Sequence, residues 1–216
     1  MNIKWLGHSC FLITAADGTT VLHDPYKDML GYKLPKGLKV DYVLSSHAHS
    51  DHNYTEGLEP GFKLIDQYGV TTEVIEFTGT LSYHDQVQGE ERGDNAIFSY
   101  VLDGLKIAHL GDLGHVLDEK QVAALAGTDI LLIAVGGGYT INGELAAEVA
   151  NQVNPKIVIP MHYRTRALGP FGLKFEKVTK FTDAYNKTVN KVKTITISEQ
   201  SIDKQADVII MDYKQK

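Results

Sequence analysis

Apolar and polar positions alternate along the first part of the chain as half-buried β-strands require. Residues 2–6, 10–15 and 19–23 predict an antiparallel meander, with a hairpin turn at Ala16-Asp17-Gly18. Residues 41–46 predict a buried strand that leads into a polar segment. Further strands are expected at 62–67, 70–77, 96–102 and 105–110.

The second half of the pattern alternates helices with strands. Asp118 can cap a helix that runs to about Ala126. Residues 129–135 are apolar throughout, which is typical of a strand covered on both faces. A helix is expected from about 142 to 153, where Asn154-Pro155 stops it. The remaining elements are expected as a helix at about 174–190 and strands at 192–197 and 207–213.

Three consecutive glycines, Gly136 to Gly138, separate the strand at 129–135 from the helix that follows. Such a run could cradle a phosphate, but it has neither the Lys-Ser/Thr of a P-loop nor G-x-G-x-x-G spacing. We therefore expect the glycines to let two backbone segments approach each other closely beside a functional cleft.

Length and composition indicate one domain over residues 1–216, because 216 residues with 43% apolar content can bury one sizeable core. No segment approaches the ~20 apolar residues that cross a bilayer. The N-terminal residues 1–5 lead into a strand without the apolar region of a signal peptide. With Cys10 as the one cysteine, we expect a cytoplasmic protein without disulfides.

The charge balance is acidic, with a formal net charge of -6 and an isoelectric point near 5.8. It provides no general basic field for nucleic acid. A small-molecule substrate is therefore the expected partner, with no nucleic acid and no membrane, and a homo-oligomer is left open.

The segment Ser46–His52 carries the strongest chemical signal. It follows an apolar run and contains three imidazoles and a carboxylate, in the pattern H-x-H-x-D-H. Residues two apart in extended chain point to the same side, so His47 and His49 can bind one ion together. Asp51 and His52 follow at the expected turn and can face a second ion. Imidazole and carboxylate suit zinc, and also manganese or iron.

Other ligand-type residues come directly after apolar runs. His84 follows the β-rich segment that begins near Val70, Asp112 follows the strand at 105–110, and His162 follows Ile157–Met161. This recurrence is what a metal site assembled at one edge of a sheet would produce.

In this order, the segments resemble the metallo-β-lactamase superfamily from Trp5 to about Thr165. Within it, Trp5–Ile13 and His23-Asp24-Pro25 resemble the branch that contains L-ascorbate-6-phosphate lactonase. The resemblance implies an α/β fold, an αββα sandwich of two mixed β-sheets flanked by helices.

The resemblance also assigns roles to residues. It puts His47, His49 and His84 on a first metal ion. It puts Asp51, His52 and His162 on a second. Asp112 would bridge the two ions, and Asp24 would brace the metal loop by hydrogen bonds.

The remaining histidines receive separate interpretations. His8, His23 and His109 adjoin strand-like segments and read first as buried core residues, although each could orient a metal ligand, His8 in particular. His115 lies three residues past Asp112 in a turn, where it could face the cleft and donate a proton.

The expected activity is metal-assisted hydrolysis. Two divalent ions, zinc in preference to manganese or iron, would make hydroxide available at neutral pH. Asp51, Asp112 and His115 are the catalytic candidates, and the substrate is expected to be a small anionic lactone or phosphoester. Arg164 and Arg166 could pair with its charge, in a loop over the cleft at 164–173. The alternatives are a phosphodiesterase acting on a nucleotide or phospholipid head group, and a metal-binding module without turnover.

Overall fold

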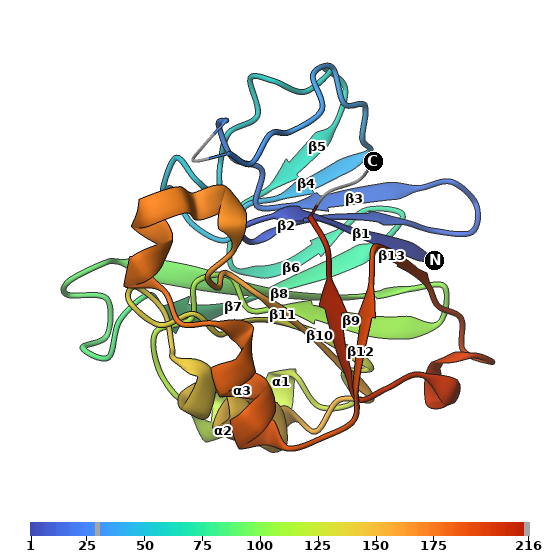
Figure 1. Cartoon of the computed structure of the whole chain (residues 1–216). Helices are drawn as coiled ribbons and strands as arrows, with labels where there is room; N and C mark the ends of the chain where they lie inside the picture. The colour runs from blue at the N-terminus through green and yellow to red at the C-terminus, as the bar shows by residue number, and fades with distance from the viewer. Residues whose placement is uncertain (29–30, 214–216) are drawn as a thin grey trace.

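Two mixed β-sheets face each other in the computed structural model, which describes residues 1–28 and 31–213 (Figure 1). The strands of the six-stranded sheet, in spatial order, are β13 (Thr194–Thr196), β1 (Asn2–Gly7), β2 (Cys10–Thr14), β3 (Thr20–His23), β4 (Tyr42–Leu44) and β5 (Lys63–Ile65). Those of the eight-stranded sheet are β12 (Val189–Val192), β14 (Val208–Met211), β11 (Ile157–Met161), β10 (Ile130–Ala134), β9 (Leu105–His109), β8 (Asp94–Leu102), β7 (Glu76–Tyr83) and β6 (Gly69–Thr72).

Alternation along the strands of the six-stranded sheet divides its side chains between two cores. Phe11 and Ile13 of β2 face the eight-stranded sheet in the main core. Cys10 of the same strand faces the other way, with Leu22 of β3 and Val43 of β4. Successive side chains of a strand point to opposite faces, and both faces of this sheet are covered, so alternate residues are buried in different cores.

The eight-stranded sheet is parallel where the sequence is apolar throughout. β9, β10, β11 and β14 run parallel, and every residue of β10 and β11 is buried. Parallel strands are normally covered on both faces, which explains the continuous apolar runs. β6, β7 and β8 extend the sheet as antiparallel strands.

The α-helices lie on the side of the eight-stranded sheet, where Figure 1 draws all three together. They are α1 (Glu119–Ala124), α2 (Gly143–Val153) and α3 (Val178–Tyr185). Asp118 and Gln121 form a capping box at the start of α1, and Asn142 caps α2 by accepting a hydrogen bond from the Leu145 N–H. None of the helices in the described part of the chain is long and apolar enough to cross a membrane.

One 3-10 segment and the loop after β3 cover the outer face of the six-stranded sheet. The 3-10 segment η1 (Arg166–Lys174) contributes Leu168 to the core there, beside Tyr26 and Tyr32 of the loop after β3. A second 3-10 turn, η2 (Ile202–Lys204), precedes β14. The sandwich expected from the sequence is confirmed, with its long helices concentrated on one side.

Three predicted elements are wrong in their boundaries. The strand expected at 70–77 is two strands, β6 and β7, which pair with each other as a hairpin. The helix expected at 174–190 is divided: residue 174 ends η1, Phe175 is extended, and α3 covers only Val178–Tyr185. The strand expected at 192–197 is shared between β12 and β13, which belong to different sheets.

The strands that lead into the candidate ligands end at one edge of the sandwich. β9, β10 and β11 run parallel, and β7 has the same direction because it is antiparallel to β8, which is antiparallel to β9. In the other sheet β3 and β4 run parallel, and β1 shares their direction through β2. The residues that follow these strands therefore meet, as they do at the carboxyl ends of parallel strands generally.

The triple glycine permits close backbone contacts at this edge, as expected. A Cβ atom at Gly136 would lie 2.0 Å from the carbonyl oxygen of His162, and one at Gly138 would lie 2.6 Å from that of Lys174. The glycines thus let the residues after β10 pack directly against the segments that follow β11.

We predict that Gly136→Ala lowers the free energy of unfolding by about 1–3 kcal/mol or more, because the added methyl group must displace His162. Metal affinity should fall with it. The control is Gly18→Ala, where a positive φ of 95° strains the backbone but nothing lies within 4 Å of the added Cβ. It should cost about 1 kcal/mol and leave metal affinity unchanged. Urea denaturation and chelator competition measure both quantities, and equal metal affinity in the two variants would contradict the prediction.

Candidate metal centre

The predicted metal ligands lie together at the strand-end edge. The ligand atoms of His47, His49 and His84 lie within 4.8 Å of one another, which matches the first group expected from the sequence. His47 and His52 form a second such group with Asp112. The loop after β4 and the ends of β7 and β9 supply these residues, from both sheets.

Asp112 lies at the centre of the cluster. Its Oδ2 lies 3.3 Å from the Nε2 atoms of His52, His84 and His162. Its backbone N–H donates to the Oδ1 of Asn95, and the Ser9 hydroxyl donates to its Oδ1. Its carboxylate therefore reaches members of both predicted ligand groups, which is the position that a bridging ligand needs.

The second predicted group contains an additional histidine. His8, His52 and His162 bring ligand atoms within 4.8 Å of one another. Asp51, which the sequence assigns to this group, has its Oδ2 3.2 Å from the His8 Nε2 and 3.9 Å from the His52 Nε2. His8, expected only to orient a ligand, thus stands among the possible ligands as well as beside Asp51.

Asp24 lies beneath the loop as a buried brace. Its carboxylate accepts hydrogen bonds from the Ser46 N–H, the Ser46 hydroxyl and the Nδ1 of His52, each at 2.8 Å. Because His52 uses Nδ1 for this bond, its Nε2 is the nitrogen that faces Asp112 and that a metal ion would take in place of a proton. These are the hydrogen bonds that a brace of the metal loop would make.

The electrostatics of the cluster keep its carboxylates ionised. Burial would raise the pKa of Asp112, but the nearby His162 and His52 hold it well below its usual value. Burial would likewise raise the pKa of Asp24, but His52 and His109 hold it well below its usual value. Both carboxylates therefore carry negative charge inside the protein, where a cation is the natural partner.

Two imidazoles of the cluster, those of His47 and His8, are held in the neutral form. Burial and the neighbouring His52 lower the pKa of His47 to about 3, and burial and His162 lower that of His8 to about 4. His52 is the exception: burial would lower its pKa, but Asp112 and Asp24 raise it well above its usual value. Neutral imidazole is the metal-binding form.

The cluster forms the floor of a cavity of about 180 Å³. Its walls come from η1, from the glycine segment after β10 and from the loop between β7 and β8. The lining residues outside the cluster are Arg92, Tyr139, Leu168, Phe171 and Phe175. The segment 164–173 was expected to lie over the cleft, and its residues Leu168 and Phe171 do line it.

The structure does not bring His115 to this cavity. Its Nε2 accepts a hydrogen bond from the Tyr83 N–H, and its Nδ1 pairs with the carbonyl oxygen of Val116. Both ring nitrogens are thus used by backbone groups, so the expected role as a proton donor has no geometric basis.

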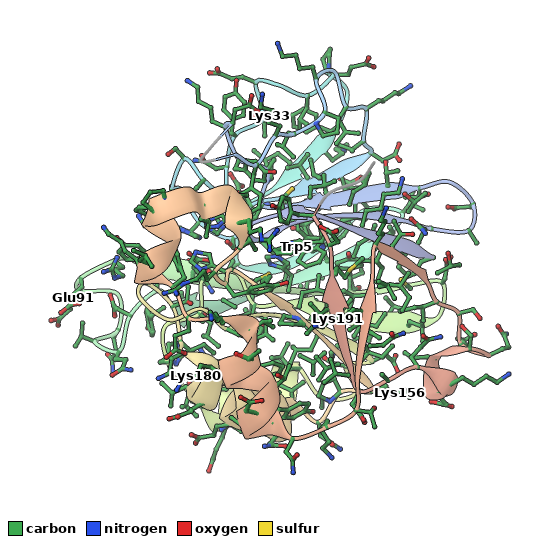
Figure 2. The ribbon with its side chains drawn as sticks, viewed as in Figure 1. Trp5, Lys33, Glu91, Lys156, Lys180 and Lys191 are labelled. Carbon is green, nitrogen blue, oxygen red and sulfur yellow. The ribbon has the colours of Figure 1, made fainter. Side chains whose placement is uncertain are left out.

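The two arginines expected to bind substrate also lie elsewhere. The Nε of Arg164 donates to the carbonyl oxygens of Gly172 and Phe175, and its Nη2 donates to that of Leu173. Arg164 therefore fixes the end of η1. Arg166 is exposed and lines a separate groove of about 520 Å³, together with Trp5 and Lys191, which are labelled in Figure 2.

Several residues of the site were not found from the sequence. Ser9 and Asn95 position Asp112, and Arg92 and Tyr139 line the cavity. The sequence did mark Asn95, because a polar residue directly before the apolar run Ala96-Ile97-Phe98 is unusual in a strand. The structure shows that Asn95 is buried. Arg92 stands in a polar loop that gives no such signal.

Comparison with known proteins agrees with this geometry. Residues 2–162 match the family model of the beta-lactamase superfamily domain. A UPF0173 protein of Pyrococcus furiosus is 32% identical over 184 residues, covering 76% of this chain and 84% of the relative. A UPF0173 metal-dependent hydrolase of Thermoplasma acidophilum is 29% identical over 197 residues, with the same two coverages.

A solved structure is similar over nearly the whole length. A Thermotoga maritima protein, assigned as a Zn-dependent hydrolase of the metallo-β-lactamase superfamily, aligns with a TM-score of 0.80. It is 32% identical in sequence, and the alignment covers 97% of each chain.

We predict that Asp24→Asn lowers metal affinity by about 10- to 100-fold, the usual effect of removing a group that orients a metal-binding histidine. Asparagine keeps the shape but loses the charge that favours donation from the His52 Nδ1. Chelator competition measures the affinity. The matched control is Asp17→Asn in the exposed β2–β3 turn, and an effect of the same size there would refute the prediction.

We predict that His115→Ala retains its metal and keeps turnover within about threefold of the wild type, well short of the 10²- to 10⁴-fold loss of an acid–base group. It should lose about 1–3 kcal/mol of stability, because the Tyr83 N–H loses its acceptor. Steady-state kinetics and urea denaturation check the two parts. A hundredfold loss of rate with intact metal would restore the proton-donor role.

Proposed function

This chain belongs to the metallo-β-lactamase superfamily and is a metal-dependent hydrolase, and on that premise we propose that it cleaves a small anionic lactone or phosphoester with two zinc ions. The observation that carries the proposal is the position of Asp112. Its carboxylate lies 3.3 Å from imidazoles of both ligand groups, at the floor of a cavity.

The donor set fits divalent metal ions. Among the described residues, the buried Nε2 atoms of His47 and His52 have no hydrogen-bond partner. An unsatisfied polar atom in a protein interior is costly, and a bound cation would remove that cost for the nitrogens that face it. Imidazole and carboxylate donors favour zinc.

The number of donors supports an enzyme over a metal-binding module without turnover. A structural zinc site closes with four protein ligands. Here three overlapping groups of ligand atoms share one floor, and an open cavity lies against them. This arrangement leaves room for a substrate beside the metal ions.

The size of the cavity supports a small substrate over a nucleotide or a phospholipid head group. The volume of the cavity is about 180 Å³. Pockets for drug-sized ligands are typically 300–1,000 Å³. A compact lactone or phosphoester matches the smaller volume.

When bound, two divalent cations would supply hydroxide at neutral pH and would polarise the oxygen under attack. The chain's own part is positional. Asp51 lines the cavity, and the His8 side chain holds the pKa of its carboxylate below the usual value although burial would raise it. Asp51 therefore stays ionised and can orient a water molecule or a substrate hydroxyl by accepting its hydrogen bond.

Apolar side chains line part of the cavity beside the metal cluster. They are Leu168, Phe171 and Phe175, and the rings of Phe175 and His162 are 5.1 Å apart. Such a wall strengthens the electrostatic interactions inside the site.

The zinc-loaded protein should hydrolyse at least one member of a panel of lactones, phosphodiesters, phosphomonoesters, thioesters and β-lactams. Asp112→Ala should lose most of the second ion and nearly all turnover, because the carboxylate shared by the two groups is gone. Elemental analysis should give two ions per chain in the wild type. One ion per chain in both proteins would exclude the bridging role, and Asp17→Ala serves as the control.

A further inference from the structure

One carboxylate organises the loop between β7 and β8, residues 85–93, which we call the Asp85 loop. The Asp85 Oδ1 accepts hydrogen bonds from the N–H groups of Val87 and Gly89, and its Oδ2 accepts from those of Glu91 and Arg92. Asp85 is buried. Figure 2 shows Glu91 at the outer end of this loop, away from the body of the molecule.

The Asp85 loop places Arg92 at the cavity. The Arg92 guanidinium carbon lies 4.7 Å from the centre of the Tyr139 ring, and both residues line the cavity. Within residues 1–28 and 31–213, no carboxylate oxygen lies within 4.0 Å of the Arg92 side-chain nitrogens. The charge of Arg92 thus faces the cavity without an anionic partner.

Tyr139 is held in place from the opposite direction. Its hydroxyl accepts a hydrogen bond of 3.1 Å from the Lys174 Nζ, and Gly138 allows the backbone of Lys174 to pack closely. Lys174 also lies 5.0 Å from the ring centre of Phe171. Two cations therefore flank one ring, and of the two only Arg92 lines the cavity.

We infer that Arg92 recognises an anionic group of the substrate, a carboxylate or a phosphate joined by a short apolar body to the bond that is hydrolysed. The inference rests on the proposed function and specifies its substrate class. The metal cluster forms one wall, the phenylalanines form an apolar wall, and Arg92 supplies a positive charge at the rim. Such a cavity complements a small molecule with the reacting group at one end and the charge at the other.

Arginine is suited to this role by its chemistry. Its planar fork donates two parallel hydrogen bonds to a carboxylate or phosphate. A guanidinium stacked on an aromatic ring is already oriented, so less conformational freedom is lost on binding. Arg164, the residue expected from the sequence to bind the anion, has donated its hydrogen bonds to carbonyl oxygens of the 172–175 backbone.

The test is a calorimetric titration with a matched pair of probes, phenylphosphonate and the neutral benzamide. The zinc-loaded wild type, Arg92→Ala, Arg92→Lys and Arg166→Ala are compared. The titrations are repeated after the zinc is removed by chelation, so that direct binding of phosphonate to metal can be separated. Arg166 is the control because it is exposed and lines a different groove.

Arg92→Ala should weaken phenylphosphonate binding about tenfold or more in both forms, the loss expected for a charge-assisted hydrogen bond. Lysine should restore only part of it, and benzamide binding should change by less than about twofold in the same variants, because it carries no charge for arginine to pair with. Arg166→Ala should match the wild type. Equal phenylphosphonate affinity in Arg92→Ala and Arg166→Ala, or an equal loss for benzamide, would overturn the inference. Failure of the substrate panel would instead refute the proposed function, since these titrations need no turnover.

Discussion

Two buried carboxylates hold the imidazoles of the metal centre in position. Asp112 lies 3.3 Å from three imidazole nitrogens, and Asp24 accepts three hydrogen bonds beneath the loop that supplies most of the ligands. Burying a charge is costly unless it is paired. Each carboxylate is therefore stable only while the imidazoles surround it, and the imidazoles are oriented only while the carboxylates remain, so the cluster forms as a unit.

The strand ends of the two sheets meet at that cluster. The backbone is strained at three of the residues there. His8, Asp24 and His162 each follow a strand and have φ angles of 55°, 43° and 53°. A left-handed conformation costs a residue with a side chain roughly 1–2 kcal/mol. All three residues belong to the metal cluster or brace it. Strain at three site residues is consistent with positions selected for geometry at the expense of stability.

Local signals were sufficient for most of the fold, and they marked the residues that meet at the candidate metal cluster. Strand alternation gave the meander, Asp118 gave the start of α1, and ligand types after apolar runs gave the strand-end residues. The predicted boundaries of strands and helices were wrong where contacts with segments distant in the sequence determine the local structure. Residues 70–77 contain no turn residue, yet the pairing of Thr72 with Glu76 folds them into a hairpin. The backbone of Glu176 bonds to Gly136 and Arg164, which prevents one long helix there. Arg92 and Arg164 could not be distinguished, because only the folded structure shows which guanidinium is already bonded to carbonyl groups.

The bonding pattern of Asp85 has a consequence for how this cavity could diversify. Its four hydrogen bonds go to backbone N–H groups, and the side chains of residues 86–88, 90 and 91 are exposed. One buried side chain, that of Asp85, thus determines the shape of the loop, and the exposed side chains contribute little to it. Apart from Gln88, whose positive φ of 59° restricts what can replace it, these outer residues can change in chains that keep this aspartate, so the rim of the cavity can acquire new selectivity while the metal-binding floor is preserved.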